Sequence, residues 1–397
     1  MRVRGGVDVF VEAWDDRVAL WEAALAAAPW VPSARPNTLS DVTPAWLREV
    51  LGALVPGARV TAIEVVGGDD GTTSRHRLAV GWNQRGRDAG LPTRVFVKAT
   101  SRGPRNRAMV AALRMSNTEV DFYRTVRDEL PFDMAPHAYA TVSGRGGRFL
   151  LLLEDMDERG YRPYTISDRA DPAFAKAMVT ALAELHAPFW ESPRFETDLA
   201  WVPTFSRRQG HTYLRRLDRR ARNRVLTAEF AREFPPEVRR LVRLTNDHHV
   251  EMERLADSRP LTFTHGDPHF GNTFATPDGR AGMYDWQLVH RRNGIQDFAH
   301  FLLGALPASL RREHERPLLQ HYLDTVADHG GRPSSFDDAW ERYRVALAYE
   351  WDAVAHIVAF PGMQPVADPA RMFGRVNNAV VDLRVDEAVE RALRSAR

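Results

Sequence analysis

The segment HGDPHFGN at residues 265–272, with YDWQ at 284–287, decides how this 397-residue chain is interpreted. It places an acid, Asp267, five residues before an amide, Asn272, and a second acid, Asp285, 18 residues after the first. The stretches LTFTH and AGMYDW on either side have the composition of short strands, and the residues between them form a polar loop. The first acid and the amide should therefore lie in a loop, and the second acid at a strand end.

This spacing fits the catalytic loop of kinases, His-x-Asp-x-x-x-x-Asn, and Asp285 stands where kinases carry a metal-binding aspartate. Phosphoryl transfer requires a protein to hold Mg²⁺ on the phosphates and an acceptor hydroxyl in line. Asp267 would take the proton of that hydroxyl, while Asn272 and Asp285 would supply oxygen ligands to Mg²⁺. The alternative is that Asp267 and Asn272 only satisfy a turn through side-chain to backbone hydrogen bonds.

Hydrophobic periodicity divides the chain into three regions. Residues 1–57 predict a helical leader, in which Thr43 caps a helix that begins with Pro44. Residues 58–156 contain the alternating stretches VTAIEVV, HRLAVGW and RVFVKAT, separated by polar loops, then a helix near 117–130 and the apolar run RFLLLLEDM. Residues 157–397 are mostly helical. The sequence predicts an α+β fold with a small antiparallel-sheet N-lobe and a larger helix-rich C-lobe.

Lys98 lies in the third predicted strand, and Glu119 follows 21 residues later in the next predicted helix. A lysine at this place suits a contact with ATP phosphates, and kinases pair it with a glutamate from the following helix. Because its helical neighbours are apolar, Glu119 should face the core, where Lys98 is its expected partner. The alternative is a capping box over residues 116–119, in which Glu119 bonds only to the helix start.

The turn GGDDGTTS between the first two strands lies where a kinase places its phosphate-covering loop. Gly71, Thr72 and Thr73 are therefore candidate nucleotide-binding residues, since glycine permits close backbone approach. Asp69 and Asp70 would repel a phosphate unless they point away, so a plain hairpin turn is the alternative.

The segments HGDPHFGN and YDWQ, with IQDFAHFL at 295–302 behind them, resemble the aminoglycoside phosphotransferase superfamily and especially its ecdysteroid-kinase-like branch. The resemblance extends back through LLLEDM, EVDFYRTV and VFVKAT, and it covers residues 43–303. It implies a two-lobed protein-kinase-like fold with ATP and Mg²⁺ as cofactors.

The resemblance also assigns roles to individual residues. It implies Asp267 as the catalytic base, Asn272 and Asp285 as magnesium ligands, and Glu154, Asp155 and Met156 as the connector that contacts adenine. Asp297 would brace the catalytic loop, with an ordinary helix N-cap as the alternative.

The predicted activity is ATP- and Mg²⁺-dependent transfer of a phosphoryl group to a hydroxyl of a small molecule. A nucleotide-binding pseudokinase with a regulatory or scaffold role is the alternative. A protein kinase is disfavoured, because IQDFAHFL follows DWQ too soon for an activation segment ending in APE. The absence of cysteine excludes disulfides, thiolate zinc sites and thiol nucleophiles. His265 and His269 lack a third ligand at metal-binding spacing, so His265 is expected to be structural.

Composition narrows the partners and the location. The formal charge is only +2, so a nucleic-acid partner is not indicated. The start lacks the apolar core of a secretion signal, and no stretch reaches the roughly 18 apolar residues of a spanning helix. We expect a cytoplasmic protein without a membrane partner, and the sequence gives no oligomeric state.

A basic segment bears on the acceptor. Residues 207–224, RRQGHTYLRRLDRRARNR, contain eight arginines and one acid. Such a segment in the region where the acceptor should dock favours a neutral or anionic hydroxyl compound over a polycation such as an aminoglycoside. The alternative is that these arginines coat a solvated helix face.

Overall fold

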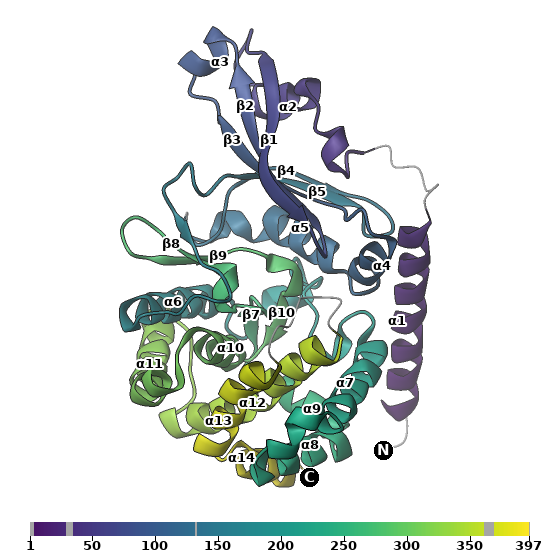
Figure 1. Cartoon of the computed structure of the whole chain (residues 1–397), viewed down its shortest axis with the longest axis vertical. Helices are drawn as coiled ribbons and strands as arrows, with labels where there is room; N and C mark the ends of the chain where they lie inside the picture. The colour runs from purple at the N-terminus through teal and green to yellow at the C-terminus, as the bar shows by residue number, and fades with distance from the viewer. Residues whose placement is uncertain (1–3, 29–34, 132, 361–368, 397) are drawn as a thin grey trace. The chain divides into compact units, whose positions relative to one another are not determined.

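The computed structural model describes residues 4–28, 35–131, 133–360 and 369–396, without side-chain detail for residues 4–15 and 371. Parts of the predicted leader, residues 1–3 and 29–34, therefore lie outside the described residues. The chain forms an N-terminal unit, Met1–Arg162 with Tyr284–Gln287, and a C-terminal unit, Pro163–Met283 with Leu288–Arg397. Figure 1 shows the elements of each unit.

The N-terminal unit contains one antiparallel sheet of five strands in the order β1-β2-β3-β5-β4. The strands are β1 (Val60–Asp70), β2 (Ser74–Trp82), β3 (Arg94–Ala99), β4 (Ala138–Ser143) and β5 (Phe149–Glu154). Alternate residues such as Val95 and Val97 pack into the hydrophobic core of this unit. Lys98 has the opposite parity and pairs with Leu151 of β5, so its side chain leaves the other face of the sheet.

The helices of this unit are α1 (Arg4–Ala27), α2 (Pro44–Leu51), α3 (Gln84–Asp88), α4 (Pro104–Ala112) and α5 (Met115–Thr125). The predicted cap is confirmed, because Thr43 Oγ1 accepts the amide of Trp46 at 3.2 Å. The sequence predicted a polar loop between the second and third strands, and over residues 83–90 that prediction was wrong. Asn83 caps the short helix α3 there by accepting the amide of Gly86, so a polar stretch with a good N-cap became helical.

The C-terminal unit is mostly helical, as predicted. Its helices are α6 (Pro172–His186), α7 (His211–Leu226), α8 (Pro236–Asp247), α9 (His249–Ala256), α10 (Ile295–Ala305), α11 (Ala308–Asp328), α12 (Phe336–Ala359), α13 (Pro369–Asp382) and α14 (Val385–Ser395). Its short strands are β7 (Thr262–Thr264), β8 (Thr273–Ala275), β9 (Ala281–Met283) and β10 (His290–Arg292), and β6 (Arg162–Pro163) lies at the boundary between the units. Strand β8 was not predicted, because its residues lie within the polar stretch that was predicted to be a loop. No described helix combines the length and the apolar content that crossing a membrane demands.

The short strands hold the loop that carries the key motif. Strand β7 pairs with β10, and the motif leaves the end of β7. Strands β8 and β9 form a hairpin that pairs Thr273 with Met283. Asn272 directly precedes Thr273 in the chain, and Asp285 follows Met283 by two residues. The small antiparallel sheet and the helix-rich second part confirm the predicted fold class.

Candidate active site

Lys98 is buried between two carboxylates in the N-terminal unit. Its Nζ lies 2.7 Å from Glu119 Oε2 and 2.7 Å from Asp285 Oδ1. Lys98 is 4% exposed and Glu119 1%. The capping-box alternative for Glu119 is wrong, because α5 already begins at Met115 and the Ser116 hydroxyl donates to the carbonyl of Gly147. The helix therefore delivers Glu119 to the sheet lysine.

This cluster holds one more negative group than positive ones. Burial raises the pKa of Glu119 to about 7, and the charge of Asp285 adds to this rise while Lys98 opposes it. Burial alone would lower the pKa of Lys98, but Asp285 and Glu119 outweigh it and raise that pKa. A second cation would relieve the two carboxylates. Hard oxygen donors with an uncompensated charge suit Mg²⁺, so these residues fit the predicted cofactor.

Asp285 is fixed by its backbone and by its neighbour. Its φ of 69° is left-handed, a conformation that aspartate tolerates better than most residues. The next residue, Trp286, is fully buried and stacks on Phe122 of α5, with ring centres 3.9 Å apart and planes 8° from parallel. Phe122 lies one helical turn after Glu119. One face of α5 therefore carries both the ring that stacks on Trp286 and the carboxylate that pairs with Lys98.

In the C-terminal unit, Asp297 braces the motif loop as predicted. Its carboxylate accepts the amide of His265 at 2.7 Å and that of Gly266 at 3.0 Å. The N-cap alternative is wrong, because Gly294 occupies the N-cap position of α10. Gly266 has φ of 83°, and a Cβ there would lie 1.8 Å from the carbonyl oxygen of Leu288, so only glycine fits.

Asp267 and Asn272 are joined directly. Asn272 Nδ2 donates to the Asp267 carbonyl at 2.9 Å and approaches its Oδ2 at 3.4 Å. The side-chain to backbone bond of the turn alternative is therefore present. It also orients the Asn272 amide and leaves Oδ1 as the oxygen available to a metal. The fully buried His265 accepts the amide of Asp267 through Nδ1 at 3.2 Å, which is a structural contact. Across the described residues, no three His, Cys, Asp or Glu side chains gather as a metal site.

Sequence reasoning missed two residues that act on Asp267. His300 Nε2, from α10, lies 3.4 Å from Asp267 Oδ1, and its Nδ1 lies 2.8 Å from Glu350 Oε2 of α12. Burial alone would lower the pKa of His300, but Glu350 and Asp267 raise it well above its ordinary value. Burial would likewise raise the pKa of Asp267, but the bond from His300 and the neighbouring imidazoles lower it. A charged imidazole thus holds Asp267 ionised.

We expect the His300 imidazole to stay protonated at neutral pH, as measured by NMR titration of its ring. Its raised pKa means that the ion pair stabilises the fold fully below the ordinary histidine pKa, and that this contribution is lost as pH rises through the folded pKa. Glu350→Gln should therefore lower the pKa of His300 and reduce the free energy of unfolding at pH 6 by about 1.5–3 kcal/mol.

The matched control is Asp337→Asn, an exposed acid on the same helix. Urea unfolding between pH 6 and pH 9 should show the Glu350→Gln deficit shrinking as pH rises, while the control stays nearly constant. A deficit that grows with pH would contradict the assigned charge of His300.

The acidic side chains of the predicted adenine connector form hydrogen bonds with main-chain amides of the protein. Glu154 Oε1 accepts the amide of His137 at 2.8 Å, and Asp155 Oδ1 accepts the amide of Asp157 at 3.0 Å. The Met156 carbonyl accepts the amide of Tyr161 at 3.0 Å. The Glu154 side chain is therefore engaged, whereas Asp155 Oδ2 is buried without a hydrogen-bond partner in the described residues.

The predicted phosphate-covering turn closes the β1–β2 hairpin. The Gly71 amide donates to the Thr73 carbonyl at 3.0 Å, and the Gly71 carbonyl accepts from Asn106 Nδ2 at 2.7 Å. Thr73 is buried, and Thr72 lies between them at the tip. Asp69 pairs with Arg75 at 2.8 Å. This ion pair within the hairpin reduces the repulsion that Asp69 would exert on a phosphate.

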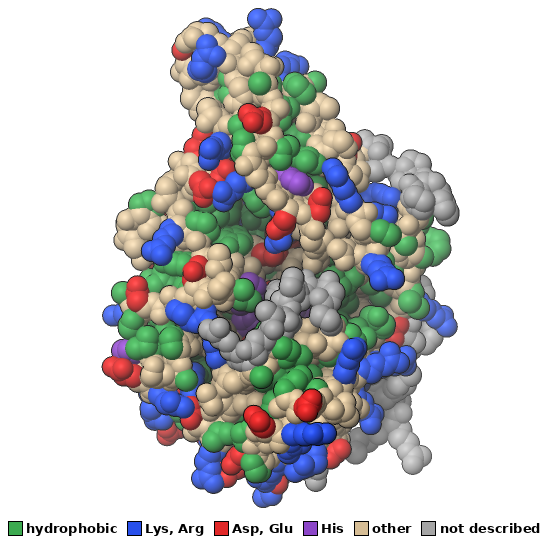
Figure 2. Space-filling view, in the orientation of Figure 1, with side chains coloured by type: hydrophobic (Ala, Val, Ile, Leu, Met, Phe, Trp, Pro, Cys, Tyr) green, Lys and Arg blue, Asp and Glu red, His purple; other side chains and the backbone are tan. Residues whose placement is uncertain are grey.

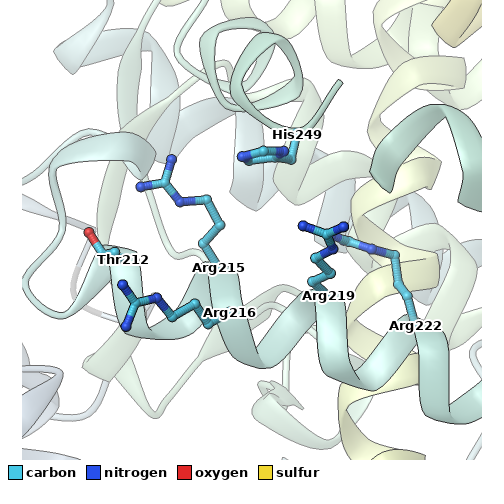
Figure 3. Close-up of a pocket in the computed structure, with 6 residues that line it drawn as sticks. All are labelled: Thr212, Arg215, Arg216, Arg219, Arg222 and His249. Carbon is cyan, nitrogen blue, oxygen red and sulfur yellow. The ribbon is translucent and has the colours of Figure 1, made fainter. Parts of the chain in front are cut away.

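The basic segment forms most of α7, and its arginines divide into two groups. Arg222 is buried and pairs with Asp352 at 2.7 Å, whereas Arg216 and Arg219 are exposed. A cavity of about 260 Å³ between α7 and α9 is lined by Thr212, Arg215, Arg216, Arg219, Arg222 and His249 (Figure 3). On the face drawn in Figure 2, basic and acidic side chains are interspersed.

Comparison with known proteins places this arrangement in context. A putative aminoglycoside phosphotransferase of Ralstonia eutropha is 14% identical, with 89% of this chain and 98% of that chain covered and a TM-score of 0.50. The choline kinase of Streptococcus pneumoniae is 12% identical, with 86% and 98% covered and a TM-score of 0.46. An ethanolamine kinase of Plasmodium vivax is 12% identical, with 84% and 83% covered and a TM-score of 0.47. The Ralstonia structure shares the fold at this identity.

No curated protein sequence matches the chain. The ecdysteroid kinase-like family, in contrast, is matched over residues 67–332, which include the sheet lysine, the motif loop and its bracing helix. The match extends over more than half of the chain and confirms the resemblance drawn from the motifs. The chain therefore belongs to the ecdysteroid kinase-like family and has the protein-kinase-like fold.

Proposed function

We propose that this protein is a small-molecule kinase that transfers the γ-phosphoryl group of ATP, with Mg²⁺, to a hydroxyl group of its acceptor. The observation that carries the proposal is the buried Lys98 ammonium between Glu119 and Asp285. This set of charges is the one that phosphoryl transfer requires around a nucleotide. Family membership supports small-molecule kinase activity in general terms.

The N-terminal unit would bind the nucleotide. Lys98 would contact its phosphates, with Glu119 holding the ammonium in place. Asp285, together with Asn272 from the motif loop, would hold Mg²⁺. The metal, when bound, neutralises charge on the phosphates and orients them. The main chain of residues 154–156 would contact adenine, and the turn at residues 71–73 would cover the phosphates.

Asp267 would accept the proton of the acceptor hydroxyl. Its lowered pKa keeps it ionised at neutral pH, which a proton acceptor needs before the reaction begins. His300 and Glu350 would act as positioning residues, because they contact Asp267 or each other and hold its carboxylate through one hydrogen bond.

The test separates a kinase from a pseudokinase. A coupled assay should show ATP consumption that depends on an acceptor from a panel of sugars, sterol-like compounds, nucleosides, hydroxy acids and aminoglycosides. Thermal shift with ATP and Mg²⁺ should show nucleotide binding in the same preparation. Nucleotide-induced stabilisation without turnover on any acceptor would favour the pseudokinase and contradict our proposal.

A further inference from the structure

Two arginines of the C-terminal unit stack on one aromatic ring. The guanidinium carbon of Arg208 lies 4.0 Å from the centre of the Phe205 ring, and that of Arg292 lies 4.4 Å from the same centre. Arg292 is 8% exposed, whereas Arg208 keeps part of its surface open to solvent. Two like charges therefore share one ring, and one of them remains reachable by a ligand.

Neither guanidinium has a carboxylate within ion-pair distance in the part of the chain that the structure describes. The Arg208 side chain makes no hydrogen bond there, and its Nε is buried without a partner. Arg292 donates to the neutral Gln296 Oε1 at 3.1 Å, and its Nε is also buried without a partner. Burial lowers the pKa of Arg208 to about 10, which still leaves it charged at neutral pH. Burying a charge without a partner costs free energy, so an anion that bound to this arginine pair would be stabilised there.

The acids nearby do not supply that counter-charge. Each acid that acts electrostatically on Arg208 is engaged elsewhere: Asp218 with His356 at 3.1 Å, Glu253 with His211 at 3.0 Å, and Asp257 with the amides of Phe205 at 2.8 Å and Ser206 at 3.1 Å. Three acids act on Arg292: Asp297, which accepts the amides of His265 and Gly266, then Asp257, and then Glu350, which is held by His300. Within the described residues, no acid therefore forms an ion pair with either guanidinium group.

The arginine pair lies beside the motif loop. Burial lowers the pKa of His290, and the charges of Arg208 and Arg292 lower it further, to about 3. His290 Nδ1 lies 3.1 Å from the point that a Cβ on Gly266 would occupy. Gly266 directly precedes Asp267, and the Phe205 ring under both arginines lies 6.4 Å from the His290 ring, centre to centre.

We infer that Arg208 and Arg292 bind an anionic group of the acceptor, a carboxylate or a phosphate, next to Asp267. The acceptor is then a hydroxyl compound with a negative charge, a narrower class than the neutral or anionic compounds that the basic segment allows. This inference rests on the proposed function, because the bound anion is part of a phosphoryl acceptor only if the protein is a kinase. The planar guanidinium fork offers paired donors that match both kinds of anion.

The experiment uses four hydroxyl compounds that share a four-carbon chain and differ in one group. They are 4-hydroxybutyrate, 4-hydroxybutyl phosphate, 1,4-butanediol and 4-amino-1-butanol. Binding to the full chain is measured by calorimetry and thermal shift without nucleotide, so the result does not depend on turnover. The wild-type protein should bind one or both anions more tightly than the diol, and the amine least, with the two anionic arms separating carboxylate from phosphate.

The variant Arg208→Met removes one fork, and Arg220→Met is its matched control, since it removes the same charge from an exposed position on α7. We expect Arg208→Met to weaken binding of the anions roughly tenfold or more, because hydrogen bonds to a charged group are lost. The affinity for the diol and the binding of ATP should stay unchanged. The control should change anion affinity less than about twofold, because only a screened surface charge is lost.

Circular dichroism and unfolding temperature check that each variant folds. Arg208→Lys keeps the charge without the fork and should give an intermediate anion affinity, so it decides the question if the methionine variant is unstable. Equal losses in Arg208→Met and Arg220→Met, or a preference for the diol or the amine, would overturn the inference. Arg208-dependent anion binding in a protein that transfers no phosphate would support the anion site and contradict only the proposed activity.

Discussion

Asp267→Asn is expected to lower kcat at least about a hundredfold on any acceptor, while binding of ATP survives. The substitution removes the proton acceptor but keeps the shape of the side chain. The loop itself should persist, because Asn272 donates to the main-chain carbonyl of residue 267 and Asp297 holds the two preceding amides. The loss should therefore appear in kcat and not in the folded structure.

A matched control is available in the same unit. Asp278→Asn makes the same chemical change at an exposed position in the turn of the β8–β9 hairpin. It should keep near wild-type kcat, and both variants should show the same thermal shift with ATP and Mg²⁺. Near wild-type turnover by Asp267→Asn would show that another group takes the proton.

The sequence predicted those parts of the candidate site whose residues lie in one element or in two neighbouring elements, at a spacing that is typical of kinases. A strand period placed Lys98, a helix stripe placed Glu119, and the structure brings the two together within hydrogen-bond distance. The motif loop likewise carries Asp267 and Asn272 in contact. Such pairs depend on one or two adjacent elements, so periodicity is enough to predict them.

The contacts that sequence reasoning missed join single polar residues on distant helices. His300 stands three residues after Asp297 in the segment IQDFAHFL, yet only the fold brings Glu350 to it. A lone polar residue in an apolar helix stretch was the one available signal. Arg208 was included in the basic segment, but nothing local distinguished it from its exposed neighbours or joined it to Arg292. Tertiary packing alone gives these residues their environment.

Asp285→Asn is expected to weaken binding of Mg²⁺–nucleotide and to lower kcat/KM roughly a hundredfold or more, because a preorganised charge on the metal and phosphates is lost. Asparagine tolerates the left-handed backbone at φ of 69°. Asp285→Ala should show the same functional loss with an added cost of about 1 kcal/mol in the free energy of unfolding, since alanine adopts this conformation less readily. The comparison separates the role of the charge from the role of the backbone.

The pH dependence of stability in the ligand-free protein tests whether Asp285 is charged beside Lys98 and Glu119. Glu119 has its pKa raised to about 7, so its ionisation costs stability, and the stability present below its ordinary pKa is lost as pH rises toward 7. Removing the charge of Asp285 should lower the pKa of Glu119, because Lys98 then faces one carboxylate. The unfolding temperature of Asp285→Asn relative to wild type should therefore rise between pH 5 and pH 8, while its response to Mg²⁺–ATP falls. Full activity of the wild-type protein in excess chelator, or an unchanged nucleotide response in Asp285→Asn, would show that Asp285 holds Lys98 and no metal.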